Sequence, residues 1–153
     1  MSCKALPGAL SFANFCEERA ITVFYISNRS DRYLEATIQN LTKVGFPFAD
    51  EAHIRLKGDV SDKSERRRQV ENEYNVVLYV GDNLVDFSEE FSDRSMQYGK
   101  QEVKGKLEEY LPKHLLLPNP MYGNWERAFS TNPNLSPNER AKSKTQGITE
   151  YDY

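Results

Sequence analysis

Two aspartates follow an apolar run near the middle of the chain. Residues 75–87 have the sequence NVVLYVGDNLVDF, in which the apolar run leads to Gly81 and then to Asp82 and Asp86. A short apolar run bounded by a glycine is typical of a buried strand. Carboxylate oxygens are the ligands that hard cations prefer. The pattern therefore predicts a cation site just beyond the carboxyl end of a strand.

Two further polar side chains stand where a phosphate could meet that cation. Ser27 follows the apolar run TVFYI, and Lys63 opens a helix expected before the Asp82 strand. Open parallel sheets bind their ligands beyond the carboxyl ends of the strands. A hydroxyl and an ammonium group bind phosphoryl oxygens, whereas carboxylates hold Mg²⁺. The order and placement of these residues together favour a phosphate-and-magnesium site.

Each of these residues also has an ordinary structural interpretation when it is taken alone. A serine such as Ser27 is common in turns, a lysine such as Lys63 is usually a solvated helix residue, and Asp82 followed by asparagine is a common strand-to-helix turn. The basic run at residues 66–68 favours a solvated helix face over a phosphate or partner patch.

The elements that must position these residues alternate between strand and helix. We expect strands at residues 20–27, 53–56, 76–80 and 114–117, and helices over about 10–19, 31–44, 62–74 and 102–111. Asp31 is a candidate cap for the second helix and Gly45 its stop, and Ser61 or Asp62 is a candidate cap for the third. The alternation favours an α/β fold with a parallel sheet covered on both faces.

Composition limits the class of protein. The length of 153 residues fits one domain, which we place at residues 1–129, followed by a polar, flexible or loosely docked tail at 130–153. Charged residues make up 28% and the net charge is −3, so a nucleic-acid polymer is not an expected partner. Cys3 and Cys16 match no metal or redox spacing. The sequence predicts neither a signal peptide nor a membrane-spanning helix.

Four segments, in this order, resemble a known enzyme family: VFYISNR, LKGDVSDKSERR, VLYVGDNLVDF and LLLPNPMYGNWE. They are similar to those of the class C acid phosphatases of the haloacid dehalogenase superfamily, the bacterial group that includes outer-membrane lipoprotein 5'-nucleotidases. The likeness runs from ALPGALSFANF to about Trp125. It implies a Rossmann-like α/β core of the haloacid dehalogenase type and Mg²⁺-dependent hydrolysis of phosphomonoesters, either nucleoside 5'-monophosphates or aryl phosphates.

The resemblance also assigns roles to individual residues. Ser27 matches the second motif of the superfamily, whose hydroxyl binds the transferring phosphoryl group, and Lys63 matches the third, whose lysine offsets negative charge. Asp82 matches the carboxylate of the fourth motif that ligates Mg²⁺. Asp86 matches its companion, which supports the metal through water or through the ligand residues.

Two residues are assigned by the resemblance to substrate binding. Asn28 lies next to Ser27 in the second motif, and Tyr122 matches an aromatic position that packs against the leaving group, such as a nucleobase. A core or loop aromatic is an equally good interpretation of Tyr122. The family is typically found in the bacterial periplasm or as an outer-membrane lipoprotein. The signal for that location would lie upstream of Met1, so the location of this chain stays open, as does its assembly into a homo-oligomer.

The nucleophile of the family reaction has no counterpart in this sequence. The family carries it on a strand of the form hhhhDxDxT upstream of the PGA segment, whereas this chain begins at Met1, six residues before Pro7. In the family fold that strand is central, between the strands that end at Ser27 and Asp82, so we expect unpaired strand edges and an inactive, N-terminally truncated phosphatase. The alternative is a non-catalytic module that binds a nucleotide or a partner through the retained site. An in-frame DxDxT just upstream would favour the enzyme.

Overall fold

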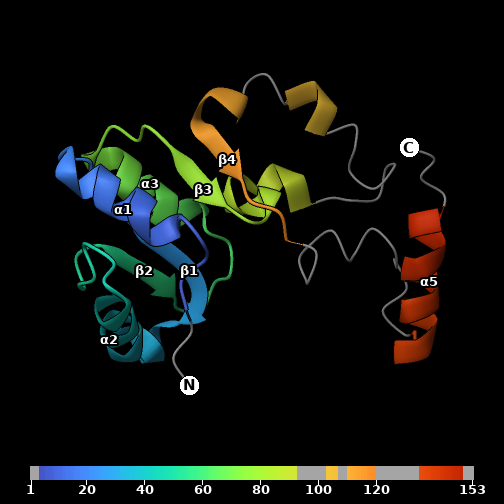
Figure 1. Cartoon of the computed structure of the whole chain (residues 1–153). Coiled ribbons are helices and arrows are strands. Elements are labelled where there is room, and N and C mark those ends of the chain that lie inside the picture. The colour runs from blue at the N-terminus through green and yellow to red at the C-terminus, as the bar shows by residue number, and fades with distance from the viewer. Residues whose placement is uncertain (1–3, 93–102, 107–109, 120–134, 150–153) are drawn as a thin grey trace. The chain divides into compact units, whose positions relative to one another are not determined.

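The computed structural model of the chain describes residues 4–92, 103–106, 110–119 and 135–149 (Figure 1). The chain divides into two compact units, Met1–Asn75 and Val76–Tyr153. The expected division into a domain at residues 1–129 and a tail at residues 130–153 stays a prediction.

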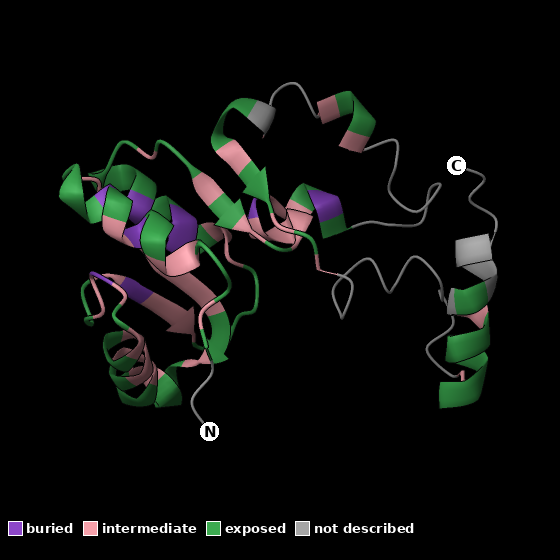
Figure 2. Cartoon of the chain, in the orientation of Figure 1, coloured by how far each residue is buried: buried purple, intermediate pink, exposed green. Residues whose placement is uncertain are grey.

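The first unit is a small parallel sheet with helices packed on it. Its elements are α1 (Ala9–Glu18), β1 (Tyr25–Ser30), α2 (Leu34–Val44), β2 (Ile54–Lys57) and α3 (Ser64–Glu73), with a 3₁₀ turn, η1 (Asp31–Tyr33), between β1 and α2. β1 pairs in parallel with β2, with Tyr25 opposite Ile54. Figure 1 shows α1 and α3 on one side of this sheet and α2 on the other. The buried apolar residues come from α1, β2 and α3: Ala13, Cys16, Ile54 and Val70 (Figure 2).

The helix α2 begins and ends close to the predicted residues. It follows the η1 turn, so helical structure of both kinds extends from Asp31 to Val44. It stops at Gly45, whose φ of 93° is in the left-handed region that favours glycine. The backbone N–H of Gly45 donates to the carbonyls of Leu41 and Thr42, so these two carbonyls of the last turn have a hydrogen-bond donor.

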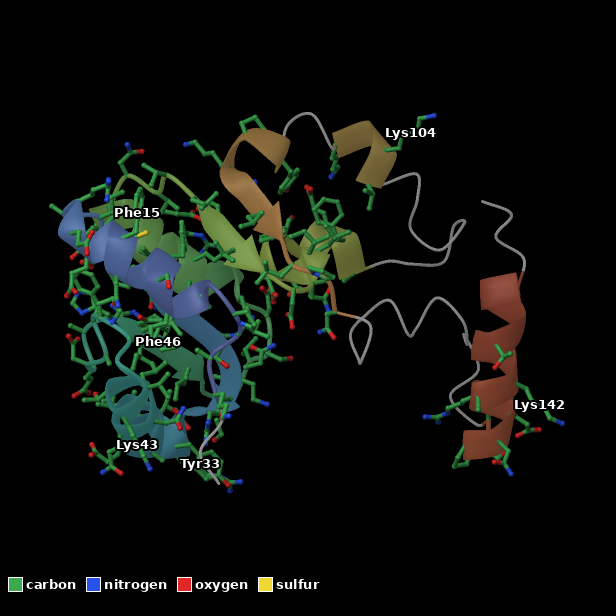
Figure 3. All side chains as sticks on the ribbon, in the orientation of Figure 1. Phe15, Tyr33, Lys43, Phe46, Lys104 and Lys142 are labelled. Atoms are coloured by element: carbon green, nitrogen blue, oxygen red, sulfur yellow. The ribbon has the colours of Figure 1, made fainter. Side chains whose placement is uncertain are left out.

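One aromatic residue ties β1 to the loop that follows α2. Tyr25 packs edge-on against the ring of Phe46, which is labelled in Figure 3, with centroids 6.1 Å apart. Its hydroxyl donates a hydrogen bond of 2.6 Å to the carbonyl of Pro47. Burial, more than the nearby Glu17 and Cys16, raises the pKa of Tyr25 to about 12. Tyr25 therefore acts as a neutral hydrogen-bond donor at any pH used for an assay.

The strand β1 lies further along the chain than predicted. The apolar run suggested a strand over residues 20–27, but the strand found is Tyr25–Ser30, so Ser27 lies within it rather than at its end. The reason is that pairing starts only where β2 starts, with Tyr25 opposite Ile54. Phe24 lies before the first paired residue. Its ring packs edge-on against the ring of Tyr74, with centroids 4.9 Å apart. The apolar run gives the presence of a strand but not the residue at which its partner begins.

The second unit holds another two-stranded parallel sheet. Its elements are β3 (Tyr79–Gly81), the 3₁₀ turns η2 (Leu84–Asp86), η3 (Glu89–Ser92) and η5 (Leu111–Lys113), β4 (His114–Leu116) and α5 (Pro137–Thr149), and residues 103–106 are also helical. β3 pairs with β4 from Tyr79 opposite His114 to Gly81 opposite Leu116. The strand at β4 was predicted within one residue, whereas α5 was not predicted.

The parallel α/β class predicted from the sequence is confirmed. The described strands form two separate two-stranded sheets. Within the described residues, β1 pairs only with β2 and β3 only with β4. Apolar side chains on β3, on β4 and just before β3 are exposed: Val77, Leu78, Val80, Leu115 and Leu116. No described helix is both long enough and apolar enough to cross a membrane.

Replacing Asp62 with alanine tests the cap of α3. Asp62 Oδ1 accepts a 2.7 Å hydrogen bond from the backbone N–H of Ser64, and this bond holds the pKa of the Asp62 carboxyl below its ordinary value of 3.8. We expect Asp62→Ala to lower the free energy of unfolding at neutral pH by about 1 kcal/mol. A carboxyl whose pKa is lowered by folding stabilises the fold fully above 3.8 and loses that contribution as the pH falls through the lowered value.

Urea unfolding at a series of pH values measures this effect. The difference between wild type and Asp62→Ala should shrink as the solution becomes more acidic than pH 3.8. Asp59→Ala is the matched control, because Asp59 is an exposed aspartate in the same loop with no hydrogen-bond partner among the described residues. Equal losses of stability in the two variants would contradict the cap.

Candidate active site

The loop after β3 is built around the carboxylate of Asp86. Asp86 Oδ2 accepts hydrogen bonds from the backbone N–H groups of Asp82 and Asn83, each 3.2 Å long. Asn83 Oδ1 in turn accepts a bond from the N–H of Val85, so that the two side chains cap η2 reciprocally. Asp86 therefore holds the backbone that presents Asp82.

Gly81 is required by the close approach of this carboxylate. A Cβ atom added to Gly81 would lie 2.8 Å from Cβ of Asp86 and 2.9 Å from its Oδ2. Atoms of a folded chain do not approach so closely, so any larger residue would displace Asp86. The glycine that the sequence analysis used only as a strand boundary is thus part of the loop architecture.

Asn119 orients the side chain of Asp82. Its Nδ2 donates a 2.8 Å hydrogen bond to Asp82 Oδ2. Asn119 reaches this position because the ladder continues one step past β4, where Leu117 N–H donates to the carbonyl of Gly81 at 2.8 Å. No role for Asn119 is predicted from the sequence alone. Its place three residues after β4, at the same sheet edge as Asp82, is the signal that could have identified it.

The carboxylate oxygens of this loop are the right type of ligand for a hard cation, but among the described residues they are too few to hold one. Asp82 is exposed, and within the described residues its second oxygen, Oδ1, has no hydrogen-bond partner. Carboxylate oxygen is the ligand type that Mg²⁺ selects. However, no group of three or more histidine, cysteine, aspartate or glutamate residues that could hold a metal occurs in the described part of the chain. Asp82 alone offers a direct ligand here, with Asp86 and Asn119 fixing its position.

The phosphate-binding candidates of the first unit meet a buried arginine. Ser27 and Asn28 lie on β1, where Ser27 Oγ accepts a 3.2 Å bond from the N–H of Arg29. Arg66, from α3, donates through Nη1 to the carbonyl of Ser27 at 2.6 Å and through Nη2 to Asn28 Oδ1 at 2.7 Å. Arg66 thus holds both the backbone and a side chain of the second-motif segment.

The same guanidinium also holds the loop that carries Lys63. Arg66 Nη2 donates to the carbonyls of Ser61 at 3.1 Å and Asp62 at 3.0 Å. Lys63 follows directly, just before the first residue of α3, and its own carbonyl accepts a 2.9 Å bond from the N–H of Arg67. Ser27, Asn28 and the Lys63 loop therefore form one hydrogen-bonded frame within the first unit.

The basic run at residues 66–68 is more buried than the sequence predicted. A solvated helix face was expected, but Arg66 is only 8% exposed and Arg67 only 7%. Arg68 alone behaves as expected, exposed and paired with Glu65. The error has a physical cause, because charge in the sequence does not show which side of a helix faces a sheet with carbonyls to satisfy. Burial lowers the pKa of Arg66, but a guanidinium stays protonated at any physiological pH.

The structure places five of the six predicted site residues. Ser27, Asn28 and Lys63 lie together in the first unit, and Asp82 and Asp86 lie together in the second. Tyr122 lies outside the described residues. The roles assigned to these residues, and the expected convergence of Ser27 and Lys63 with Asp82, stay predictions.

Comparison with known proteins decides the family. Residues 1–125 match the family described as the HAD superfamily, subfamily IIIB (Acid phosphatase). The chain belongs to this acid phosphatase family.

A solved acid phosphatase extends this match to the fold. The class C acid phosphatase from Bacillus anthracis is similar in structure, with a TM-score of 0.84 and 36% sequence identity, and the match covers 97% of this chain and 63% of that chain. The same phosphatase with tungstate bound gives the same values. The predicted resemblance to the class C acid phosphatases is confirmed. This chain corresponds to 63% of the length of that solved relative.

Replacing Gly81 with alanine tests the architecture of the loop after β3. The added Cβ would push Asp86 away, so we expect Gly81→Ala to lower the free energy of unfolding by about 1–3 kcal/mol. The backbone amide signals of Asp82 and Asn83 should shift in the NMR spectrum, because both lose their shared acceptor. Gly105→Ala is the matched control, since a Cβ on Gly105 would meet nothing within 4 Å.

The control variant Gly105→Ala has its own expected effect on the free energy of unfolding. Gly105 lies in the helical residues 103–106, so alanine should leave stability unchanged or raise it by up to about 1 kcal/mol. A Gly81→Ala variant as stable as wild type would show that the loop does not depend on the close contact with Asp86.

Proposed function

We propose that this chain supplies the phosphate-binding and metal-binding parts of a Mg²⁺-dependent acid phosphatase of the 5'-nucleotidase type. Its substrates would be nucleoside 5'-monophosphates or aryl phosphates. The observation that carries the proposal is the frame around Arg66, whose four hydrogen bonds hold Ser27, Asn28 and the loop just before Lys63 in a chain of an acid phosphatase family. A role limited to general packing would not require donors aimed at these segments.

Each residue has a separate task in the proposed reaction. The Ser27 hydroxyl and the Asn28 amide donate hydrogen bonds to phosphoryl oxygens, and the Lys63 ammonium group offsets their negative charge. Asp82 holds the metal, while Asp86 and Asn119 keep its carboxylate in place. Mg²⁺ itself, when bound, would act as a Lewis acid on a phosphoryl oxygen. Tyr122 would pack against an aromatic leaving group.

Binding of a tetrahedral oxyanion is the part of this proposal closest to a known relative. The Bacillus anthracis phosphatase has been solved with tungstate bound. Tungstate has the shape and charge of a phosphoryl group, so we infer that the Ser27 and Lys63 frame of this chain binds the same class of anion.

A second candidate function follows from the missing nucleophile. No DxDxT motif occurs in the 153 residues, and hydrolysis through an aspartyl phosphate needs its first aspartate. A chain that retains the anion frame without a nucleophile would serve as a binding module for a nucleotide or a phosphorylated partner. The two functions differ in turnover but not in anion binding.

The 153-residue chain by itself should bind tungstate and hydrolyse nothing. We expect no release of nitrophenol from p-nitrophenyl phosphate above background with Mg²⁺, because metal and anion binding cannot replace a covalent nucleophile. Calorimetry should show tungstate binding that is weakened about tenfold or more in Lys63→Met, which loses a charge-assisted hydrogen bond. Lys43→Met, which removes the same charge from the exposed end of α2, is the matched control.

Two outcomes would count against this scheme. Turnover that Asp82→Ala abolishes would mean that another carboxylate of this chain acts as the nucleophile. Equal tungstate affinity in the Lys63→Met and Lys43→Met variants would remove Lys63 from the anion site.

Joining the chain to a nucleophile-bearing strand should restore both stability and chemistry. We expect a fusion that places an hhhhDxDxT segment of a class C acid phosphatase before Met1 to melt at a higher temperature. An added strand would cover apolar surface such as Val80, worth about 25 cal/mol per Å². The fusion should hydrolyse p-nitrophenyl phosphate with Mg²⁺. Asp82→Ala should abolish most of that activity, and Tyr122→Ala should chiefly weaken aryl substrates and spare alkyl phosphates.

The control is the same fusion with both aspartates of the added segment replaced by asparagine. It should melt as high as the active fusion but remain inert, which separates the packing of the strand from its chemistry. A fusion that melts no higher than the original chain, or that stays inert with Mg²⁺, would favour the binding module.

A further inference from the structure

Arg66 is a buried cation that no carboxylate neutralises through a direct contact within the described residues. It is 8% exposed, and its acceptors are the carbonyls of Ser27, Ser61 and Asp62 and the side-chain oxygen of Asn28. Burying a guanidinium is costly unless its donors are satisfied. An apolar residue would leave these acceptors without donors, so the hydrogen bonds of Arg66 decide how Ser27 and Asn28 sit against the loop before Lys63.

The contact with Asn28 fixes the direction of an amide. Asn28 Oδ1 accepts a 2.7 Å bond from Arg66 Nη2, so the oxygen end of the amide faces α3. The Nδ2 group then points to the other side, and within the described residues it has no hydrogen-bond partner. An amide nitrogen carries two donors and no acceptor, which suits an anion.

We propose that Arg66 is a positioning residue that turns Asn28 Nδ2 and the Lys63 loop toward a phosphoryl group. The inference rests on the proposed phosphate site and extends it, because it names the residue that sets the orientation of two of its donors. Arg66 acts through Asn28 and through the carbonyls of Ser61 and Asp62.

Lysine cannot take over this role. The guanidinium is planar and carries its donors on three nitrogens, of which Nη1 and Nη2 here reach acceptors on both β1 and the loop before α3. A lysine ammonium is a single point with three donors on a flexible stem. Arg66→Lys therefore keeps the positive charge but loses the planar arrangement of donors. The variant tests the geometry of the donors separately from their charge.

The test is a titration of the full chain with inorganic phosphate, followed in the ¹H–¹⁵N NMR spectrum. In wild type we expect phosphate to shift the Asn28 side-chain NH₂ signals and the backbone amides around Ser27 and Lys63. In Arg66→Lys the apparent Kd for phosphate should rise about tenfold. The heteronuclear NOE of the Asn28 NH₂ group should fall even without phosphate, because its oxygen is no longer held.

Two further variants separate positioning from stability. Asn28→Asp keeps an acceptor for Arg66 but replaces the Nδ2 donors with a negative charge. It should melt at or above the wild-type temperature and lose phosphate binding at least tenfold. Val70→Ala truncates a buried apolar residue of the same helix, so it should lower the melting temperature without changing the apparent Kd below the unfolding range.

The outcomes distinguish this inference from the proposed function. If wild type shows no phosphate-dependent shift near Ser27 or Lys63, the phosphate site is wrong and the role of Arg66 falls with it. If wild type responds and Arg66→Lys has the same Kd and the same NOE at Asn28, only the positioning role is wrong. Should Arg66→Lys fail to fold, Asn28→Asp decides, because undiminished phosphate affinity in that variant overturns the proposal.

Discussion

A guanidinium that is buried must have its donors satisfied, and in this chain that requirement links two segments far apart in the sequence. Arg66 is separated by 39 positions from Ser27, yet it donates to the carbonyl of Ser27 at 2.6 Å. An unsatisfied buried charge would cost several kcal/mol, on the order of the whole stability of a small domain. β1 and the loop before α3 therefore cannot shift against each other, and Lys63 takes its place from that loop.

The second unit also holds a loop with one charged side chain, but there the charge is negative. There an anion collects N–H donors, because Asp86 Oδ2 accepts from the backbones of Asp82 and Asn83. In the first unit a cation collects carbonyl oxygens. Each unit thus fixes a polar loop next to a parallel strand with one charged side chain that binds backbone. These two residues, Arg66 and Asp86, carry little chemistry themselves, but they set where Ser27 and Asp82 can lie.

Sequence patterns predicted the elements better than the contacts between them. The end of α2 was predictable because glycine adopts the left-handed conformation found at Gly45 more readily than any other residue. The start of β1 was not, because it depends on where β2 begins. Arg66 was misjudged because composition says nothing about which face of α3 is covered. Asn119 was overlooked because its bond to Asp82 depends on the pairing of β3 with β4.

The frame around Arg66 and the loop around Asp86 each close within their own unit. Asp86 binds amides three and four positions away, and Arg66 binds carbonyls four and five positions away as well as β1. What such local frames do not supply is a shared sheet, since strand pairing in the described residues stays inside each unit. Binding needs only a frame, whereas hydrolysis needs the two frames and a nucleophile in line. Under the proposed function, the 153 residues on their own should therefore bind an anion without turning over a phosphomonoester.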